Sequence, residues 1–284
     1  MKVVAIAALL LASTAHAETR RAFCELLPCL GEVETRVLKR DTVISGVRCK
    51  KGEIGEHKGG GLAFCETARA QTIDGLPVAR EAYTLVYPSG RLYQTHLGKA
   101  VVVDGIPCGK GLIARTETGK LRYCEPSRPW QTGTLVARAG EGLYLEDGRV
   151  LALTLDAPAT ISGLALPAGT RIQCDGTTLR ELWVEKTIVI GALTWRGTVT
   201  LHANGRVEKG TLAVKAKLGG QELPEFTDVT FGADGVVTYA EYVEDYDTMP
   251  HGELVTKTRH LSFKKGVLAS SYLDEYQSDV RPPH

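Results

Sequence analysis

The chain has 284 residues, of which 24% are charged, with 34 Lys and Arg against 33 Asp and Glu. Basic and acidic residues are interleaved along the whole length, so the chain lacks the concentrated basic face that nucleic acid or an anionic membrane surface requires. The composition therefore argues against nucleic acid as a partner. No Ser/Pro-rich linker or charge block interrupts the chain, and we expect one domain after the N-terminal segment.

Residues 1–17 have the layout of a secretory signal peptide. Lys2 precedes an apolar run over residues 3–12, and Ala15-His16-Ala17 forms an A-x-A cleavage site. Ten apolar residues are too few to cross a bilayer, and no cysteine follows the cleavage site directly to carry a lipid. We expect cleavage near Ala17 and a periplasmic or extracellular mature chain with no transmembrane segment. Loss of Lys2 (34 − 1 = 33) leaves that chain with 33 basic and 33 acidic residues.

A glycine recurs along the chain at intervals of 28 to 31 residues. Its positions are Gly31, Gly60, Gly90, Gly119, Gly148, Gly176, Gly205, Gly235 and Gly266. Such a period is typical of repeat proteins, in which each supersecondary unit buries its apolar face only by stacking on its neighbours. A propeller blade usually needs about 40 to 45 residues, so this period argues against a propeller.

Two further anchors and an alternating apolar pattern indicate strands. An apolar-apolar-x-Gly step recurs at Gly46, Gly75, Gly105, Gly133, Gly163 and Gly191, and another glycine at Gly52, Gly111, Gly140, Gly169 and Gly197 opens a short strand. Between the anchors apolar residues alternate with polar ones, as in residues 148–155, and no helical stripe extends beyond about two turns. Asp147-Gly148, Asn204-Gly205 and Asp234-Gly235 predict primed hairpin turns.

These patterns predict an all-β fold, an open array of about eight 29-residue antiparallel β-hairpin repeats with about three short strands each. The array forms an elongated twisted sheet or a β-solenoid. We expect residues 18–42 to form an N-terminal cap of half a repeat, residues 43–276 the β-repeat domain, and residues 277–284 a C-terminal tail.

Two hairpin segments, Tyr87-Pro88-Ser89-Gly90-Arg91-Leu92 and His202-Ala203-Asn204-Gly205-Arg206-Val207, resemble the MORN-type repeat. In that family an aromatic residue, a turn and a Gly-x-aliphatic step recur along an extended hairpin sheet. The resemblance implies a scaffold or binding array, and it carries over no catalytic residue.

Four of the cysteines occupy matching positions in two repeats. Cys49 and Cys65 are 16 residues apart, as are Cys108 and Cys124. In other units the two positions hold other residues, for example Val78 and Thr95, so both are cysteine together or neither is. In an oxidising compartment this co-occurrence predicts the disulfides Cys49–Cys65 and Cys108–Cys124, each closing a hairpin across its turn. A zinc site is disfavoured because units 59 residues apart are separated by an intervening unit.

Three cysteines lie outside these two matching pairs. Cys24 and Cys29 can pair with each other in the cap. Cys174 is then left over, and its alternation with Ile172 favours a buried, inert thiol over an exposed, reactive one.

We find no catalytic motif, no cofactor fingerprint and no metal-ligand spacing that carries a functional assignment. His202 occupies the position of Tyr87, which favours a strand residue over a catalytic base. The most unusual stretch interleaves acids and tyrosines, and its members are Tyr239, Glu241, Tyr242, Glu244, Asp245, Tyr246 and Asp247. One interpretation is a solvated strand with packed tyrosines; the other is a surface that binds a saccharide or calcium. A glycosidase that uses Glu241 and Glu244 as its carboxylate pair stays a further alternative, although two acids three apart on a strand point to opposite faces.

Two functional hypotheses remain. The first is an exported, non-enzymatic β-repeat scaffold or binding protein that presents an extended surface to a protein or envelope polymer. The alternative is a secreted hydrolase that acts on glycan or peptide, with its site in the C-terminal units rich in Tyr, Glu and Asp. A deep pocket with converging polar groups would favour the hydrolase.

Overall fold

The computed structural model describes residues 32–248 and 254–278. Every regular element in these ranges is a β-strand, 28 in all, and the strands pair in antiparallel fashion. Twenty strands belong to one sheet, and the other eight form four two-stranded hairpins. The predicted all-β array of antiparallel hairpins is confirmed, as is the near absence of helix. The chain divides into two compact units, Met1–Arg122 and Tyr123–His284.

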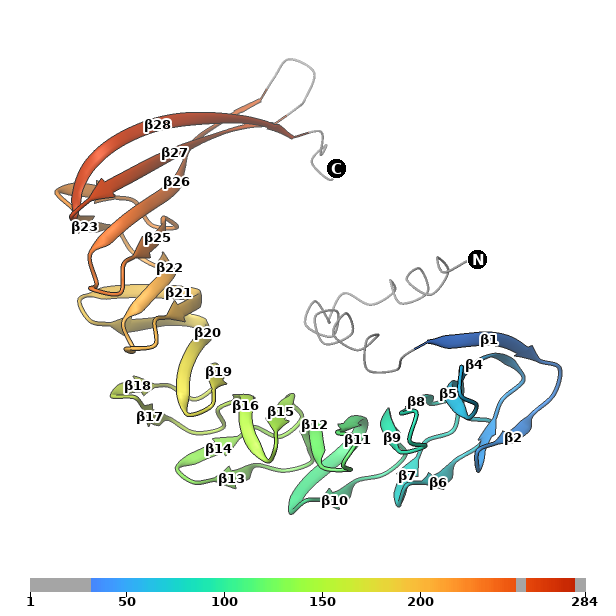
Figure 1. Cartoon of the computed structure of the whole chain (residues 1–284). Coiled ribbons are helices and arrows are strands. Elements are labelled where there is room, and N and C mark those ends of the chain that lie inside the picture. Colours follow the sequence, from blue (N-terminus) through green and yellow to red (C-terminus); the bar gives the residue numbers. More distant parts are fainter. Residues whose placement is uncertain (1–31, 249–253, 279–284) are drawn as a thin grey trace. The chain divides into compact units, whose positions relative to one another are not determined.

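In the first unit, long strands form a meander and short strands form side hairpins (Figure 1). The meander strands, in order of pairing, are β1 (Val33–Leu38), β4 (Gly52–His57), β5 (Leu62–Glu66), β8 (Tyr83–Val86), β9 (Leu92–Leu97) and β11 (Ile106–Arg115). The side hairpins are β2 (Thr42–Ile44) with β3 (Val47–Cys49), β6 (Gln71–Ile73) with β7 (Leu76–Val78), and β10 (Val101–Val103) with the start of β11.

The second unit continues the same alternation. Its meander strands are β12 (Leu121–Pro126), β15 (Leu143–Glu146), β16 (Arg149–Thr154), β19 (Arg171–Asp175), β20 (Thr178–Ile190), β21 (Leu193–Leu201), β22 (Val207–Leu212), β25 (Asp228–Phe231), β26 (Val237–Thr248), β27 (Leu254–Lys264) and β28 (Val267–Ser278). Its separate side hairpins are β13 (Trp130–Thr132) with β14 (Leu135–Ala137), β17 (Ala159–Ile161) with β18 (Leu164–Leu166), and β23 (Ala216–Leu218) with β24 (Gln221–Leu223).

A full repeat therefore holds two hairpins, not the three short strands expected. The apolar-apolar-x-Gly step is itself a two-residue turn, since Asp74 and Gly75 have φ of 48° and 79° between the paired residues Ile73 and Leu76. Positive φ at both central residues defines the primed turn that matches strand twist. In some repeats a meander strand and a side-hairpin strand form one continuous strand. β20 and β21 are examples, since their ends also form the side hairpin that turns between Ile190 and Leu193.

The periodic turn glycine forms a second type of turn. Asp147 and Gly148 both have positive φ, as predicted for a primed turn, but at Asn204-Gly205 and Asp234-Gly235 only the glycine does. There the loop is longer. The amide of His202 bonds to the carbonyl of Arg206, and that of Gly205 bonds back to His202. A turn followed by a left-handed glycine makes a bulge, so the prediction of primed turns at these two sites was wrong.

The side hairpins cover one face of the meander and create the core. In the first unit Cys65 pairs with Thr84, and Thr95 pairs with Ile113, all of them buried. The hydroxyls of Thr84 and Thr95 bond to each other at 2.8 Å, so these polar atoms are satisfied inside the core. Inward residues of the side hairpins, such as Val78, are buried as well, and each fully buried aliphatic side chain contributes about 1.5 to 3 kcal/mol.

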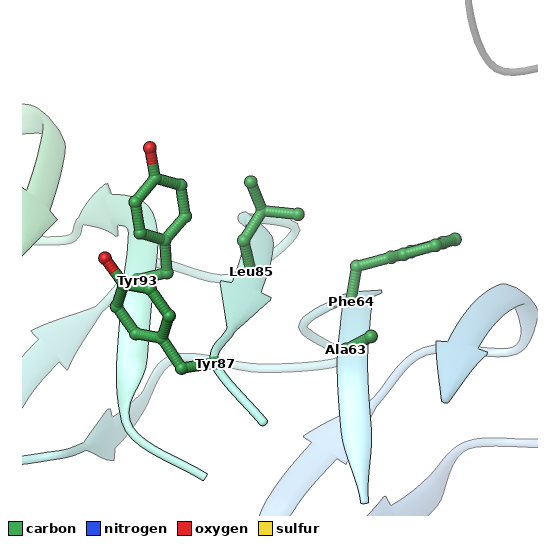
Figure 2. Close-up of a cluster of buried hydrophobic side chains, with 5 residues drawn as sticks. All are labelled: Ala63, Phe64, Leu85, Tyr87 and Tyr93. Atoms are coloured by element: carbon green, nitrogen blue, oxygen red, sulfur yellow. The ribbon is translucent and has the colours of Figure 1, made fainter. Parts of the chain in front are cut away.

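The opposite face of the first unit carries an aromatic cluster (Figure 2). Tyr87 and Tyr93 meet edge to face at 4.9 Å, and Phe64 lies across the paired glycine, Gly55. A Cβ atom at Gly55 would lie 2.3 Å from the Phe64 ring, so only glycine admits this contact. Gly210 and Trp195 repeat the relationship in the second unit, where the corresponding distance is 2.7 Å. An aromatic ring thus covers a glycine on a neighbouring strand in both units.

Candidate binding surfaces

The predicted ligand surface lies on β26, and the strand divides it between two faces. Glu241 pairs with His260 on β27, which pairs with Tyr272 on β28, so these three share one face. Tyr242 pairs with Arg259 and faces the other way. The side chains of Asp245, Tyr246 and Asp247 lie outside the described part of the structure.

Tyr239, Glu241 and His260 form a directed hydrogen-bond chain. The Tyr239 hydroxyl lies 2.9 Å from Glu241 Oε2 and 2.5 Å from His260 Nδ1. A carboxylate only accepts, so the hydroxyl donates to Glu241, and Nδ1 must carry a proton and donate to the hydroxyl oxygen. Burial, followed by the bond to Glu241, raises the pKa of Tyr239, and the phenol stays protonated at neutral pH.

His260 also contacts an exposed aromatic ring. Its imidazole stacks on Tyr272, with centroids 4.6 Å apart and planes 13° from parallel. Tyr272 is 54% exposed, whereas the His260 side chain is 14% exposed. The chain from Glu241 through Tyr239 to His260 therefore holds in place the histidine on which Tyr272 lies. Sequence reasoning did not bring His260 and Tyr272 to this site, because only the strand register does so.

The opposite face carries an ion pair. Arg259 donates from Nε to Glu244 Oε2 at 2.8 Å, and its Nη2 lies 2.7 Å from the same oxygen. Glu241 faces the other side, so the two glutamates do not approach each other. The expectation that Glu241 and Glu244 point to opposite faces of the strand agrees with these contacts.

The histidines that open the periodic turns connect one repeat to the next. His57 donates from Nε2 to the carbonyl of Val86 at 2.9 Å, and His202 donates to that of Phe231 at 3.0 Å, in each case 29 residues along the chain. Tyr87, at the equivalent position, donates its hydroxyl to the carbonyl of Arg115 at 3.0 Å. His202 was expected to be a strand residue, but it lies just after β21 and makes this contact from the turn.

Polar side chains within the turns make further links of the same kind. Arg91 follows Gly90 and donates to the carbonyl of Thr118 at 3.0 Å. Arg206 follows Gly205 and donates to the carbonyl of Asp234. Asn204 donates to Ala233 at 2.7 Å, again across 29 residues. Carbonyl groups at successive turns are thereby satisfied by the preceding repeat.

The side hairpins present a regular row of exposed side chains, which we call the outward row. In the first strand of each hairpin the flanking residues are partly or fully buried and the middle residue is exposed. The outward row comprises Val43, Thr72 and Val102 in the first unit and Gln131, Thr160, Val189 and Lys217 in the second. Its valines are strongly exposed, at 54% for Val43, 65% for Val102 and 67% for Val189. The row was not predicted from the sequence, because the apolar-apolar-x-Gly step was not identified as the turn of a side hairpin.

Cys49 and Cys65 form the predicted disulfide, with Cα atoms 5.7 Å apart. It joins the end of the side hairpin, in β3, to β5, rather than closing one hairpin across its turn. Both cysteines are fully buried, and β4 lies between them in the sequence. Cys108 and Cys124 are also disulfide-bonded. Cys24 and Cys29 lie outside the described residues.

Cys174 is a free thiol that is half-buried, not fully buried as expected. The register of β19 with β20 shifts between Gln173 and Cys174, and the bulge takes Cys174 out of the simple alternation with buried Ile172. Burial raises the pKa of the Cys174 thiol, which disfavours the nucleophilic thiolate.

Across residues 32–248 and 254–278, no group of three or more His, Cys, Asp or Glu side chains has the geometry to hold a metal ion. The same residues contain no helix long and apolar enough to cross a membrane. Comparison with known proteins found no family model that matches the chain and no matching curated protein.

Proposed function

We propose that this protein is an exported, non-enzymatic scaffold that binds an extended protein or envelope polymer along its repeats. The outward row is the observation that carries the proposal. Val43, Val102 and Val189 expose apolar side chains at the same position of their repeats. Scattered exposed valines need no explanation, but these three occupy equivalent positions in a row that exposes one side chain per repeat, which suits a partner that is itself extended.

The cross-repeat hydrogen bonds support the same function. His57, Tyr87 and His202 bond to carbonyls of the following repeat, and so do Arg91 and Arg206. These bonds restrict the sliding or twisting of one repeat against the next. A surface held in its binding geometry loses less conformational entropy when it binds, which favours affinity.

The disulfides support export. Cys49–Cys65 is a bonded pair, and disulfides persist in oxidising compartments outside the cytosol. The signal-like segment at residues 1–17 lies outside the described residues. N-terminal sequencing of the protein recovered from the periplasm or medium tests the compartment and the cleavage site together; recovery only from the cytosol with residues 1–17 intact contradicts export.

Binding is tested with the mature chain immobilised and exposed to envelope extract and to purified envelope polymers. The variant Val43→Asp/Val102→Asp places two charges on the outward row. The control Gly59→Asp/Ser89→Asp places two at exposed tips of the periodic turns, where φ of Gly59 is not positive and no heavy atom lies within 4 Å of its Cβ position. We expect the row variant to lose the bound component at least tenfold and the control to keep it. Equal retention by both variants, or no retained component at all, contradicts the proposal.

The alternative function is a secreted hydrolase that acts on glycan or peptide, and the hydrogen-bond chain of Tyr239, Glu241 and His260 is the observation that favours it. These groups lie beside the exposed ring of Tyr272, and an aromatic face suits a sugar. Because its pKa is raised, Tyr239 is a poor nucleophile, so Glu241 and His260 would have to supply acid-base catalysis. Hydrolysis of a glycan or peptide panel by the mature protein, abolished by Glu241→Gln, would support this function over the scaffold.

A further inference from the structure

Within residues 32–248 and 254–278, the last strand of the second unit has a partner strand on one side only. Among the described residues β28 pairs only with β27, over eleven residue pairs from Leu254↔Ser278 to Lys264↔Val267. Residues Ser271 to Glu275 are all exposed. The backbone N–H and C=O groups on the far side of β28 therefore form a template for another strand.

β28 also lacks the features that usually protect a sheet edge. From Val267 to Leu273 it contains no charged residue and no proline, and its pairing with β27 is interrupted by a single register shift. β1, whose paired strand among the described residues is β4, is different. It has six residues, and Arg36 on it binds Glu56 on β4 at 2.7 Å. Short length and charge are the means by which natural edges avoid pairing, and β28 has neither in its first seven residues.

We propose that two copies of this protein associate by pairing β28 with β28 in an antiparallel arrangement about a two-fold axis at Tyr272. A two-fold axis normal to the sheet keeps every side chain on its original face of the sheet. Residues that lie opposite each other in the two copies must therefore share a face, so their residue numbers are both odd or both even and have an even sum. An axis at Tyr272 places Tyr272 opposite Tyr272 of the second copy. It also places Ser270 opposite Asp274, and Ala269 opposite Glu275.

Charge excludes the arrangements that would set the acids of the two copies against each other. β28 is acidic only in its second half, at Asp274 and Glu275. Parallel pairing in register would set each acid beside its own copy, and an antiparallel axis at Asp274 would do the same for that residue. With the axis at Tyr272 both acids face small uncharged residues, and the Ser270 hydroxyl can donate to Asp274. Like charges directly opposite each other destabilise a sheet, so charge rules out parallel pairing in register and axes at Asp274 or Glu275, and it permits the axis at Tyr272.

The aromatic side chains favour the same axis. Tyr272 is 54% exposed and stacks on His260 of its own chain at 4.6 Å. Cα atoms of directly opposite residues in an antiparallel pair are about 4.5 to 5.5 Å apart, so the two Tyr272 rings would lie side by side. The result is a continuous row of four aromatic rings, and aromatic pairs across strands stabilise a sheet. An isologous contact of this kind closes as a dimer and does not propagate into a fibre.

The sign of the charge at position 270 tests the register. Ser270 is exposed, and in the proposed dimer it faces Asp274 of the second copy. We expect the mature protein to dimerise in sedimentation-equilibrium measurements, Ser270→Asp to weaken dimerisation at least tenfold, and Ser270→Lys to maintain or strengthen it. Adding salt should reduce the difference between the two variants. A monomer at all accessible concentrations, a polymer, or a dimer equally stable in both variants would overturn the proposal.

Cysteine cross-linking tests the axis independently of affinity. In a Cys174→Ser background, Tyr272→Cys places two thiols across the proposed axis. Ala269→Cys is the matched control, because residue 269 of one copy faces residue 275 of the other and lies six residues, about 20 Å, from its own counterpart. We expect a mild oxidant to give a covalent dimer of the Tyr272→Cys protein and none of the control. Equal cross-linking of both, or of the control alone, contradicts an axis at Tyr272. Neither experiment involves the outward row, so the scaffold function and the dimer can fail separately.

Discussion

His202 donates from Nε2 to the carbonyl oxygen of Phe231 at 3.0 Å, and this bond joins equivalent ends of two successive repeats. His57 makes the same bond to Val86 in the other unit at 2.9 Å. In both cases the acceptor residue immediately precedes the equivalent turn-opening position of the next repeat. The stability of a repeat array is approximately the sum of repeat and interface contributions, so such bonds add to every interface in which they occur.

Replacement of His57 by alanine should therefore destabilise the first unit. His57 is only 7% exposed, so the variant leaves the Val86 carbonyl without this donor and creates a cavity. We expect the free energy of unfolding to fall by about 1 to 3 kcal/mol in urea denaturation followed by circular dichroism. Lys58→Ala at the neighbouring exposed position is the control and should change stability by less than about 0.5 kcal/mol. Equal effects of the two variants would mean that the His57 bond contributes nothing to the interface.

The contact between Phe64 and Gly55 gives a second test. Gly55→Ala would place a Cβ atom 2.3 Å from the Phe64 ring and 2.7 Å from a Val33 methyl group, so the ring must move. We expect a loss of about 1 to 3 kcal/mol in unfolding free energy, the usual cost of overpacking. Gly59→Ala lacks both a steric conflict and a positive φ and should be neutral or slightly stabilising. In a Phe64→Ala background the ring is absent, so adding Gly55→Ala should lower the unfolding free energy far less than it does in the native chain.

The sequence predicted the repeat and the strands because glycine spacing and alternation are local signals. The aliphatic residues that follow the periodic glycine are core residues, as Leu62 and Leu92 show with 1% exposure each. The turn at Asn204-Gly205 was assigned the wrong geometry, since the same dipeptide fits both a primed turn and a bulged loop. The choice depends on the length of chain between the paired strands, which composition does not specify.

The candidate sites were harder to predict. The interleaved acids and tyrosines of β26 were visible in the sequence, but Glu241 and Glu244 belong to different faces with different partners. His260 and Tyr272 join Glu241 through strand register over distances of 19 and 31 residues along the chain. The outward row depends on a side hairpin that is recognised only once the apolar-apolar-x-Gly step is read as a turn.

Alkaline pH should weaken the first unit through Tyr83. Burial, with a smaller contribution from Glu53, raises the pKa of Tyr83 to about 12, from an ordinary value of 10.0. The unfolded chain therefore ionises first as pH rises, so the stabilisation is complete below pH 10 and is lost between about pH 10 and 12. Because Tyr83 is 40% exposed, we expect a modest effect. Urea midpoints from pH 9 to 11.5 should fall less steeply for Tyr83→Phe than for the native chain; parallel curves would contradict this assignment.

The disulfide Cys49–Cys65 offers a test in which the chain supplies its own control. Closing a loop of this length should contribute about 3 kcal/mol by restricting the unfolded state. Cys49→Ala/Cys65→Ala removes the bond and leaves a cavity at two fully buried positions. Cys49→Val/Cys65→Thr also removes the bond. It fills the two positions with valine and threonine, the residue types found at the equivalent buried positions Val78 and Thr95 of the next repeat. We expect the Val/Thr protein to lose about 3 kcal/mol in unfolding free energy and the Ala/Ala protein to lose more.

The losses of unfolding free energy in the Val/Thr and Ala/Ala proteins distinguish the contribution of the disulfide bond from that of core packing. If the Val/Thr protein matches the native chain, the cysteines serve as core residues and the bond itself adds little. Cys174→Ser provides a baseline and should leave stability nearly unchanged, since Cys174 is free and half-buried. Peptide mapping without reductant should recover Cys49 linked to Cys65 and Cys108 linked to Cys124. Recovery of Cys108 or Cys124 linked to Cys24 or Cys29 would instead mean that the matching positions in the two repeats record duplication and do not determine the second bond.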